Sequence, residues 1–249
     1  MKEQIDELSK KFYDIKAKGW IKSYRNDLGG IGHTFEKLIG IPSNELEIPD
    51  FNQIEIKTKT KYSNSYTTLF NCTPTGPHYH EVERLKDKYG YPDSKLKEYK
   101  VLNTSIYSNR KNKVGINFFF ELKVSKFKNK LYLFIYDKKW NIIEDIVYWD
   151  FDILKEKLYR KLKYLAYVKA LKKIINNEKY FKYYEMKIYK LKDFNTFINL
   201  LDSGIIRISI KIGIFREGNK LGKIHDHGTS FCIQEENLNK LYDLIKIYK

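Results

Sequence analysis

The sequence predicts a mixed α/β fold with a large antiparallel component. Segments with helical periodicity alternate with strand-like segments up to residue 89, and mostly strand-like segments joined by short polar turns follow from residue 101. No internal repeat, low-complexity segment or Pro/Ser-rich linker interrupts the 249 residues. This length suffices for one large domain or for two small lobes with a hydrophobic core. We therefore expect lobes that are continuous with each other.

The N-terminal part is expected to alternate helices and strands. Apolar side chains recur at helical spacing over residues 3–17, and a second helix opens at the glycine-rich "DLGGIG" and ends near Gly40. Pro42 and Pro49 frame a short loop after this helix. The further elements expected here are strands at 52–61 and 66–72, a loop at 74–80 and a helix at 80–89.

The remainder of the chain is expected to be mainly β. Strand-like alternation or a short buried apolar run occurs at 101–108, 114–124, 130–137, 142–149, 164–171, 180–190, 205–215, after residue 224 and at the C-terminus. Helical periodicity occurs at 151–163, 192–202 and 236–241. Charged turns such as "NRKNK" (109–113) and "KFKNK" (126–130) connect successive strands, which favours antiparallel pairing.

The charge balance predicts a polyanionic partner. Lys and Arg total 47 against 31 acidic residues, which gives a formal net charge of +16. Such an excess says nothing about the fold but favours binding to a polyanion such as nucleic acid. A lysine-rich proteome is the alternative explanation. The 21 tyrosines can each bury a ring and still present a hydroxyl, so we expect them to line a basic surface.

Several classes of protein are excluded by composition. The two cysteines, Cys72 and Cys232, suit neither a disulfide framework nor a cysteine-based zinc site. The N-terminal "MKEQIDELSKKF" has no apolar signal core, and the longest apolar run, near "INFFFEL", is too short to span a bilayer. We therefore expect a soluble protein of a reducing compartment, the cytoplasm, with no membrane partner.

The stretch "PDFNQIEIKT" combines strand alternation with an acidic cluster. Residues two apart in a strand share a face, so Glu55 and Lys57 project together while Ile54 and Ile56 point to the core. Asp50 precedes them by five residues across a bend, where a turn could bring its carboxylate beside Glu55. Two carboxylates and an intervening main-chain carbonyl are oxygen ligands that suit Mg²⁺.

A lysine beside such a metal site fits metal-assisted phosphodiester hydrolysis. The ion would orient and activate a water molecule, and the lysine would stabilise the developing negative charge. Glu36 on the preceding helix is a candidate for a further active-site carboxylate. The alternative is that Glu55 and Lys57 form an exposed ion pair of little energetic value and that Glu36 is a solvated helix residue.

A second candidate site is the loop "GKIHDHGTSF". It contains His225, Asp226 and His227 in succession. Zinc binding is one interpretation, because His-x-His ligates zinc in many folds. Recognition of base edges in DNA is another, and a capped turn with solvated charges is the third. The strand and loop before it add a polar, mostly basic set of side chains: Arg207, Ser209, Lys211, Arg216, Lys220 and Lys223.

Four segments together resemble a known family. "GGIGHTFEKLIGI", "PDFNQIEIKT", "VYWDFD" and "GKIHDHGTSF", in this order, resemble the monomeric type II restriction endonucleases of the MvaI/BcnI group, which are related to the mismatch-repair nickase MutH. The resemblance implies a PD-(D/E)xK restriction-endonuclease-like core, with a mixed central sheet flanked by helices, and a β-rich DNA-recognition lobe. On this basis residues 1–165 are expected to be mainly catalytic and residues 166–249 mainly DNA-reading.

The resemblance also implies roles for single residues. Asp50 and Glu55 would bind Mg²⁺, Ile56 would lend its carbonyl oxygen, and Lys57 would be the catalytic lysine, with Glu36 close to them. His225, Asp226 and His227 fall on the major-groove loop of the family, Asn109 and Arg110 match a basic turn that touches DNA, and the 73–80 loop is expected to assist from the minor groove. Ser209, Lys211 and Cys232 depart from the family pattern, in which we expect an acid and two arginines, and this puts the target sequence in doubt.

The activity implied is cleavage of double-stranded DNA at a short pseudopalindrome of the CC-W-GG or CC-S-GG kind. The products would carry 5′-phosphates, and a monomer would nick the two strands in sequence. A cognate DNA methyltransferase would be a functional partner only. The alternatives are a MutH-like repair nickase and a non-catalytic nucleic-acid-binding protein.

Overall fold

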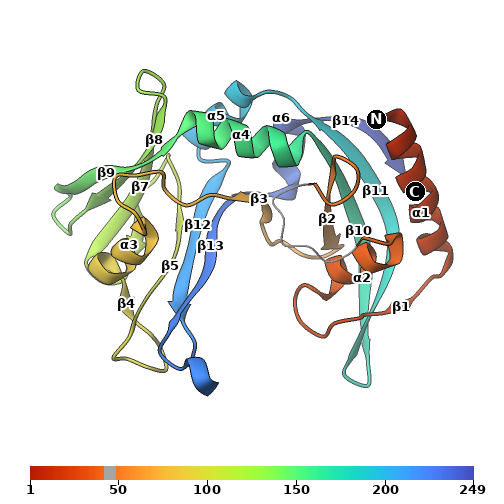
Figure 1. Cartoon of the computed structure of the whole chain (residues 1–249), viewed down its shortest axis with the longest axis horizontal. Helices are drawn as coiled ribbons and strands as arrows, with labels where there is room; N and C mark the ends of the chain where they lie inside the picture. The colour runs from red at the N-terminus through yellow and green to blue at the C-terminus, as the bar shows by residue number, and fades with distance from the viewer. Residues whose placement is uncertain (42–48) are drawn as a thin grey trace. The chain divides into compact units, whose positions relative to one another are not determined.

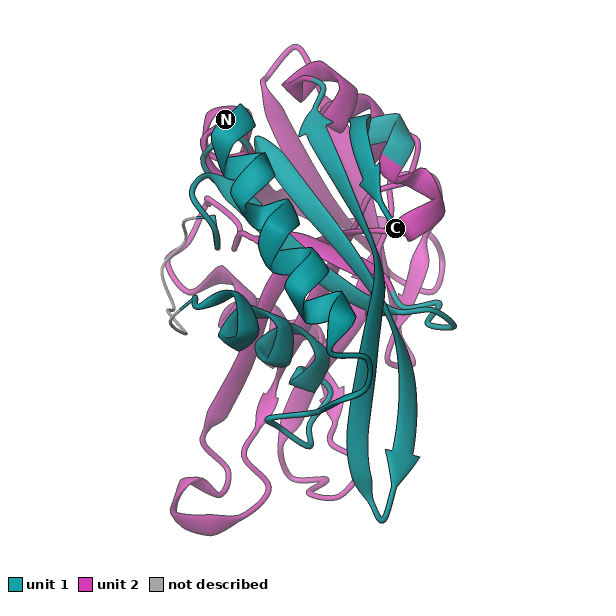
Figure 2. Ribbon diagram, turned by 90° about the vertical axis from the view of Figure 1, so that its right-hand side faces the viewer, with its two compact units in different colours: residues 1–65, 159–192, 239–249 teal, residues 66–158, 193–238 magenta. Residues whose placement is uncertain are grey.

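The computed structural model describes residues 1–41 and 49–249, which form two compact units (Figures 1 and 2). Unit 1 comprises residues 1–65, 159–192 and 239–249, and unit 2 comprises residues 66–158 and 193–238. Most of the loop expected between Pro42 and Pro49 lies outside the described residues. The units are discontinuous in sequence, unlike the expected division near residue 165, because strands from distant parts of the chain pair within each unit.

Unit 1 is built on one five-stranded sheet. The strands are β1 (Ile21–Lys22), β11 (Glu178–Leu191), β10 (Tyr164–Ile175) and β2 (Ile54–Thr60) in that order, with β14 (Tyr242–Tyr248) also paired to β11. β2 pairs with β10 in parallel, from Ile54 opposite Tyr164 to Thr60 opposite Ala170. The other pairs are antiparallel. This parallel pair places the acidic stretch beside a buried strand that follows it by more than a hundred residues.

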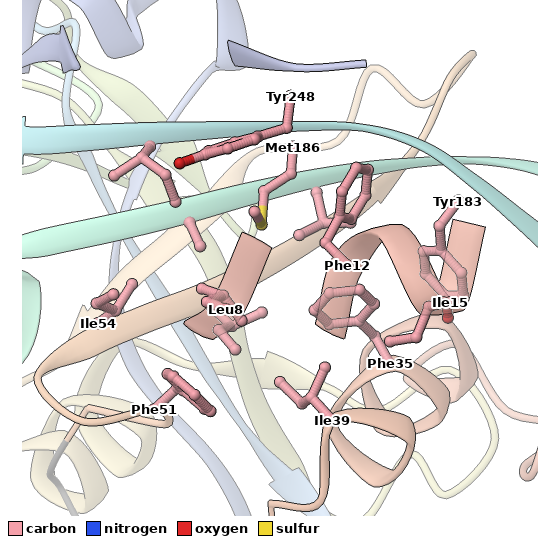
Figure 3. Packing of buried hydrophobic residues seen from close by; sticks show 14 of the residues in the cluster. Leu8, Phe12, Ile15, Phe35, Ile39, Phe51, Ile54, Tyr183, Met186 and Tyr248 are labelled. Atoms are coloured by element: carbon pink, nitrogen blue, oxygen red, sulfur yellow. The ribbon is translucent and has the colours of Figure 1, made fainter. Parts of the chain in front are cut away.

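Two helices complete the core of unit 1. α1 (Lys2–Ala17) and α2 (Gly30–Ile39) bring Leu8, Phe12, Ile15, Phe35 and Ile39 against the sheet (Figure 3). The start of α2 requires glycine, because a Cβ at Gly30 would clash with the main-chain oxygen of Arg25. Its end uses Gly40, which has φ +82° in the left-handed region that glycine adopts without strain.

Unit 2 contains two sheets. The first has the order β3 (Thr67–Asn71), β13 (Ile224–Ile233), β12 (Arg207–Ile214), β5 (Lys100–Ile106) and β4 (Tyr91–Pro92). The second has the order β6 (Asn112–Val114), β7 (Phe118–Ser125), β8 (Lys130–Tyr136) and β9 (Ile142–Asp150). All pairs in both sheets are antiparallel, as the sequence predicts for this part of the chain.

Helices and aromatic side chains fill the space around these sheets. α3 (Glu81–Tyr89) packs against β5 and β12, and α5 (Phe194–Asp202) packs against β7. Phe70 and Phe231 stack at 4.9 Å, and Trp149 meets Phe231 edge-on and donates its indole N–H to the Cys72 oxygen at 2.9 Å. Both cysteines, Cys72 and Cys232, are buried, and neither forms a disulfide.

The predicted elements are confirmed with two differences. The expected strand 114–124 is split into β6 and β7, because Gly115 (φ +56°) turns the chain between them. The expected helix 236–241 is a 3₁₀ turn (Glu235–Asn237) followed by the short α6 (Leu238–Leu241). The helix expected at 151–163 is α4 (Phe151–Leu162), within which the boundary between the units falls. None of the helices in the described residues is long and apolar enough to cross a membrane.

Candidate active site and nucleic-acid interface

A tight turn places Asp50 beside the start of β2. Asn52 and Gln53 both have positive φ (40° and 75°), as in the type I′ turns of hairpins. Phe51 and Ile54 close the turn with reciprocal main-chain hydrogen bonds of 2.9 and 2.7 Å. The reversal lets the Asp50 Oδ2 accept the N–H of Ile56 at 2.8 Å. The expected approach of Asp50 to the strand is therefore confirmed.

Glu55 is an almost completely buried carboxylate of this site. It is 1% exposed, and Lys57 Nζ lies 2.5 Å from its Oε1. The two residues share a face of β2, as their spacing predicts. Lys161, near the end of α4, contributes a second ammonium 3.6 Å from the same oxygen. The other carboxylate oxygen, Oε2, is buried and has no hydrogen-bond partner in the described residues.

The carboxyl groups of the site influence one another. Burial raises the pKa of Glu55, and the Asp50 charge raises it further, while Lys57 and Lys161 lower it. Burial likewise raises the pKa of Glu36, again with a contribution from Asp50. The structure therefore brings Glu36, predicted from the preceding helix, within electrostatic range of both Asp50 and Lys57.

Two residues of this site have no local sequence signal. Lys161 is one of 47 basic residues, and only the packing of unit 1 places it next to Glu55. Tyr242 opens β14 and is fully buried, with a hydroxyl that lacks a partner among the described residues. Burial and then Glu55 raise the pKa of this hydroxyl. Both side chains lie far from the acidic stretch in sequence.

The donor set fits a hard divalent cation that keeps part of its water shell. The described residues include no group of three or more His, Cys, Asp or Glu side chains that could hold a metal ion. Asp50 and Glu55 nevertheless offer carboxylate oxygens, and a buried carboxylate oxygen without a partner is unfavourable until a cation or a donor meets it. Ile56 donates its N–H to Asp50, and the role of its carbonyl stays a prediction.

In unit 2, β12 presents an apolar face and a polar face. Ile208, Ile210 and Ile212 are fully buried. The opposite face carries Arg207, Ser209 and Lys211, as the alternation predicts. Of these three, Lys211 is exposed, Arg207 is half-buried and Ser209 is buried. Across the pair of strands, Arg207 lies opposite Cys232 and Ser209 opposite Ser230, so all the positions that depart from the family pattern lie on this face.

The expected histidine loop is part of β13 in the structure, and His225 forms an aromatic stack there. The rings of Phe215 and His225 are 4.1 Å apart and nearly parallel, and His227 follows at 3.9 Å from His225. Asp226 Oδ1 accepts the N–H of Gly228 at 2.7 Å, and Gly228 has φ +90°. The capped turn is therefore present, while zinc finds no further ligand within the described residues. Asp226 also lines a cavity of about 360 Å³ together with residues 73–75 and 78–83.

The other residues predicted to bind DNA differ in how strongly they already interact with other side chains of the protein. Arg216 gives both arms of its guanidinium to Asp93, at 3.2 and 2.7 Å, and this pair strongly lowers the pKa of Asp93. Lys220 lies 5.2 Å from the centre of the Phe215 ring, and Lys223 is exposed. In the 109–113 turn, the Asn109 side chain packs against Gly204, where a Cβ would clash with it. The Arg110 guanidinium stacks over Tyr107 at 3.7 Å.

Comparisons with known proteins extend over almost the whole chain. Residues 9–242 match the MvaI/BcnI restriction endonuclease family. The solved structure of a restriction endonuclease MvaI–cognate DNA substrate complex is 33% identical to this chain in sequence, with a TM-score of 0.91 and 98% of each chain covered. A structure of MvaI in the absence of DNA is also 33% identical, with a TM-score of 0.63 and coverage of 99% of this chain and 98% of that one. No curated protein sequence matches.

The family match and the likeness to the MvaI structure identify the chain as a site-specific DNA endonuclease. The α/β architecture predicted from the sequence agrees with that of MvaI. The chain belongs to the MvaI/BcnI restriction endonuclease family, which confirms the resemblance stated from the four sequence segments.

Proposed function

We propose that this chain is a Mg²⁺-dependent type II restriction endonuclease that hydrolyses double-stranded DNA at a short pseudopalindromic site and leaves 5′-phosphates. The observation that carries the proposal is the buried Glu55 with one unpaired oxygen, next to Asp50 and Lys57. Family membership and the likeness to a DNA-bound MvaI structure support DNA as the substrate. A charge of +16 favours the same partner.

The residues of β2 and its preceding turn would do most of the work in cleavage. When bound, Mg²⁺ would supply positive charge at the scissile phosphate and activate a water molecule. Asp50 is already oriented by the Ile56 N–H, and Glu55 by two ammonium groups. The Lys57 ammonium would hold the attacking water and offset the charge that develops on the phosphate.

Unit 2 would read the target sequence. His225 is stacked on Phe215 and contacts the tilted ring of His227, and this restricted orientation suits hydrogen bonds to base edges in the major groove. Lys223, which is exposed, would contact a phosphate. Because Ser209, Lys211 and Cys232 differ from the expected acid and arginines, we expect a target that differs in detail from CC-W-GG and CC-S-GG.

We further propose that the protein acts as a monomer that nicks one strand and then the other. One chain carries one Asp50–Glu55–Lys57 set among its described residues, and each such set can cut one strand in one binding event. The chain would work beside a DNA methyltransferase that protects the host site. The two cysteines, which form no disulfide, fit a reducing compartment such as the cytoplasm.

Incubation with supercoiled plasmid and Mg²⁺ tests the proposal. We expect nicked circles first and linear DNA later, no product in EDTA, and one recurring sequence at the fragment ends. For a monomer, the nicking rate should rise in direct proportion to protein concentration, and not with its square. Nicked circles that never become linear would indicate a repair-type nickase instead, and binding without any Mg²⁺-dependent cleavage would contradict the proposal.

A further inference from the structure

Arg207 is held by two tyrosines at the start of β12. Its Cζ lies 3.5 Å above the centre of the Tyr66 ring, and its Nη1 donates a hydrogen bond of 2.8 Å to the Tyr107 hydroxyl. The two hydroxyls are 3.4 Å apart. The Tyr107 ring also carries the guanidinium of Arg110, whose Cζ lies 3.7 Å from the ring centre. We call Tyr66 and Tyr107 the tyrosine clamp.

The tyrosine clamp fixes the Arg207 fork without neutralising it. No carboxylate pairs with Arg207 within the described part of the chain, whereas Arg216 gives its fork to Asp93. A guanidinium has five N–H donors, and the clamp uses one of them. The Nε of Arg207 is buried without a partner among the described residues. Arg207 therefore keeps its charge unpaired within the described residues, and three of the four N–H donors on its terminal nitrogens stay uncommitted.

The tyrosines are themselves well anchored. Tyr107 is only 6% exposed. Burial would raise the pKa of Tyr107, but the hydrogen bonds with Tyr66 and Arg207 bring it below its ordinary value, as expected for a hydroxyl that accepts from a cation. An arginine whose rotation is already restricted loses less entropy when it meets a planar acceptor pair.

The location of Arg207 indicates which acceptor this is. Arg207 shares the polar face of β12 with Ser209 and Lys211 and lies opposite Cys232, on the same strand pair that carries the histidine stack. A phosphate can accept a bidentate fork, but it is also bound by a flexible lysine acting as a point charge. The O6 and N7 of guanine accept two hydrogen bonds from a guanidinium only when it lies in the plane of the base. A guanidinium with a fixed orientation is therefore suited to bind a base edge.

We propose that Tyr66 and Tyr107 are positioning residues that orient Arg207 to bind the major-groove edge of one guanine in the target. This inference rests on the proposed function, because it requires that unit 2 reads DNA. It adds a guanine-specific contact through a residue clamped by neutral aromatic side chains, and it makes the hydroxyl of Tyr107 a determinant of specificity.

The test uses equilibrium binding without Mg²⁺, so that cleavage is not required. The target is first determined from fragment ends or, if nothing is cut, by selection from random duplexes. Each guanine of the target is then replaced in turn by 7-deazaguanine, which lacks the N7 acceptor. In the unsubstituted protein, one such replacement should weaken binding about 5–150-fold. The same replacement should have no effect in Arg207→Ala, because the contact is already absent.

Tyr107→Phe tests the tyrosine clamp itself, because it keeps the ring and removes the hydroxyl that holds Arg207. Cognate affinity should fall about 3–10-fold, non-cognate affinity should stay the same, and the penalty for 7-deazaguanine should shrink. Tyr91→Phe is the matched control: it removes a phenol that donates to the Asn103 oxygen in the same sheet, and it should leave the affinity ratio unchanged. Arg207→Lys should resemble Arg207→Ala on the guanine series.

Three outcomes would overturn the inference. Equal losses on cognate and non-cognate DNA in Arg207→Ala, with a salt slope reduced by about one, would identify a phosphate contact. A lower melting temperature for Tyr107→Phe with an unchanged affinity ratio would make the clamp purely structural. If every guanine keeps its 7-deaza penalty in Arg207→Ala, base reading by Arg207 is excluded. The proposed function fails separately, if the unsubstituted protein binds without specificity and does not cleave.

Discussion

Glu144 in unit 2 and Glu55 in unit 1 are both buried beside cations, yet their surroundings act on them in opposite directions. Glu144 is 7% exposed, and both of its carboxylate oxygens accept hydrogen bonds, from Arg84, Lys88 and Tyr89. Burial alone would raise the pKa of Glu144, but these donors bring it down to about 2. This carboxylate is fully paired and joins α3 to β9.

Glu55 is more deeply buried and less completely paired. Lys57 and Lys161 both approach its Oε1, and its Oε2 has no partner among the described residues. Its pKa is raised, because the lysines do not offset burial. The comparison with Glu144 shows that the fold can satisfy a buried carboxylate where stability requires it. At Glu55 one oxygen is left available, and a bound cation is the partner that we expect there.

The largest expected effect is the loss of DNA cleavage when a residue of the β2 site in unit 1 is replaced. Lys57→Ala should slow cleavage by at least about 10²–10³-fold, because an ammonium that offsets transition-state charge is removed. Asp50→Ala should be similarly inactive, and single-turnover cleavage of the target measures both. Specific binding in EDTA should be retained. Lys61→Ala is the control, because Lys61 is an exposed lysine just after β2, and this variant should cleave normally. Full-rate cleavage by Lys57→Ala would refute the assignment of Lys57 as the catalytic lysine.

A matched pair of substitutions tests the difference between the glutamates directly. Glu144→Gln should lower the free energy of unfolding by about 1–3 kcal/mol, because charge-assisted hydrogen bonds are lost. Glu55→Gln should leave the metal-free protein equally stable or more stable, since its ionised form is disfavoured by burial, and should abolish cleavage. Urea unfolding in EDTA measures both. Equal destabilisation by the two changes would show that the glutamates play the same structural role.

Base reading should depend on His225 but not on the exposed Lys223. His225→Ala should lower cognate affinity about 5–10-fold and leave non-cognate affinity unchanged, because a contact to a base edge is lost. Lys223→Ala should instead weaken both to the same extent and reduce the salt slope by about one. Fluorescence anisotropy with the two duplexes at several salt concentrations distinguishes them. An unchanged affinity ratio in His225→Ala would count against base reading there.

The smallest effect concerns the pH dependence of stability in the metal-free protein. The pKa of Glu144 is lowered on folding, so its contribution is complete above pH 4.5 and is lost as the pH falls toward about 2. The pKa of Glu55 is raised, so its ionisation opposes folding as the pH rises above 4.5. The free energy of unfolding should therefore fall less steeply toward acid pH in Glu144→Gln than in the unsubstituted protein. Above pH 4.5 it should decline less in Glu55→Gln than in the unsubstituted protein. Identical pH profiles for the two variants would contradict the opposite shifts.

Local patterns were sufficient to predict the elements that carry both sites. The alternation around Ile54 and Ile56, and around Ile208 and Ile210, predicts strands with one apolar face, and β2 and β12 have that form. The split of the expected strand 114–124 was not predicted, because a glycine inside an apolar run also fits a continuous strand. Nor does alternation alone show that Glu55, on the polar face, is 1% exposed.

Partners distant in the chain were beyond prediction. Arg207 and the Tyr107 hydroxyl are 100 residues apart, and Arg216 and Asp93 are 123 apart. With 47 Lys and Arg residues and 21 tyrosines, no spacing rule selects one pair from another. Arg207 and Arg216 therefore looked alike in the sequence as basic candidates, whereas the structure pairs one with a carboxylate and clamps the other between tyrosines.

The sequence by itself determined which residue types share a strand face, where the chain turns, and that four ordered segments belong to one endonuclease family, because these properties depend on neighbours a few positions apart. Only the tertiary structure decided that Lys161 lies 3.6 Å from Glu55 and Tyr242 within its electrostatic range, that one oxygen of this carboxylate has no partner among the described residues, and that Tyr66 and Tyr107 hold Arg207. Burial and pairing depend on which distant segments pack together, and the electrostatic character of a carboxylate or a guanidinium is set by that packing.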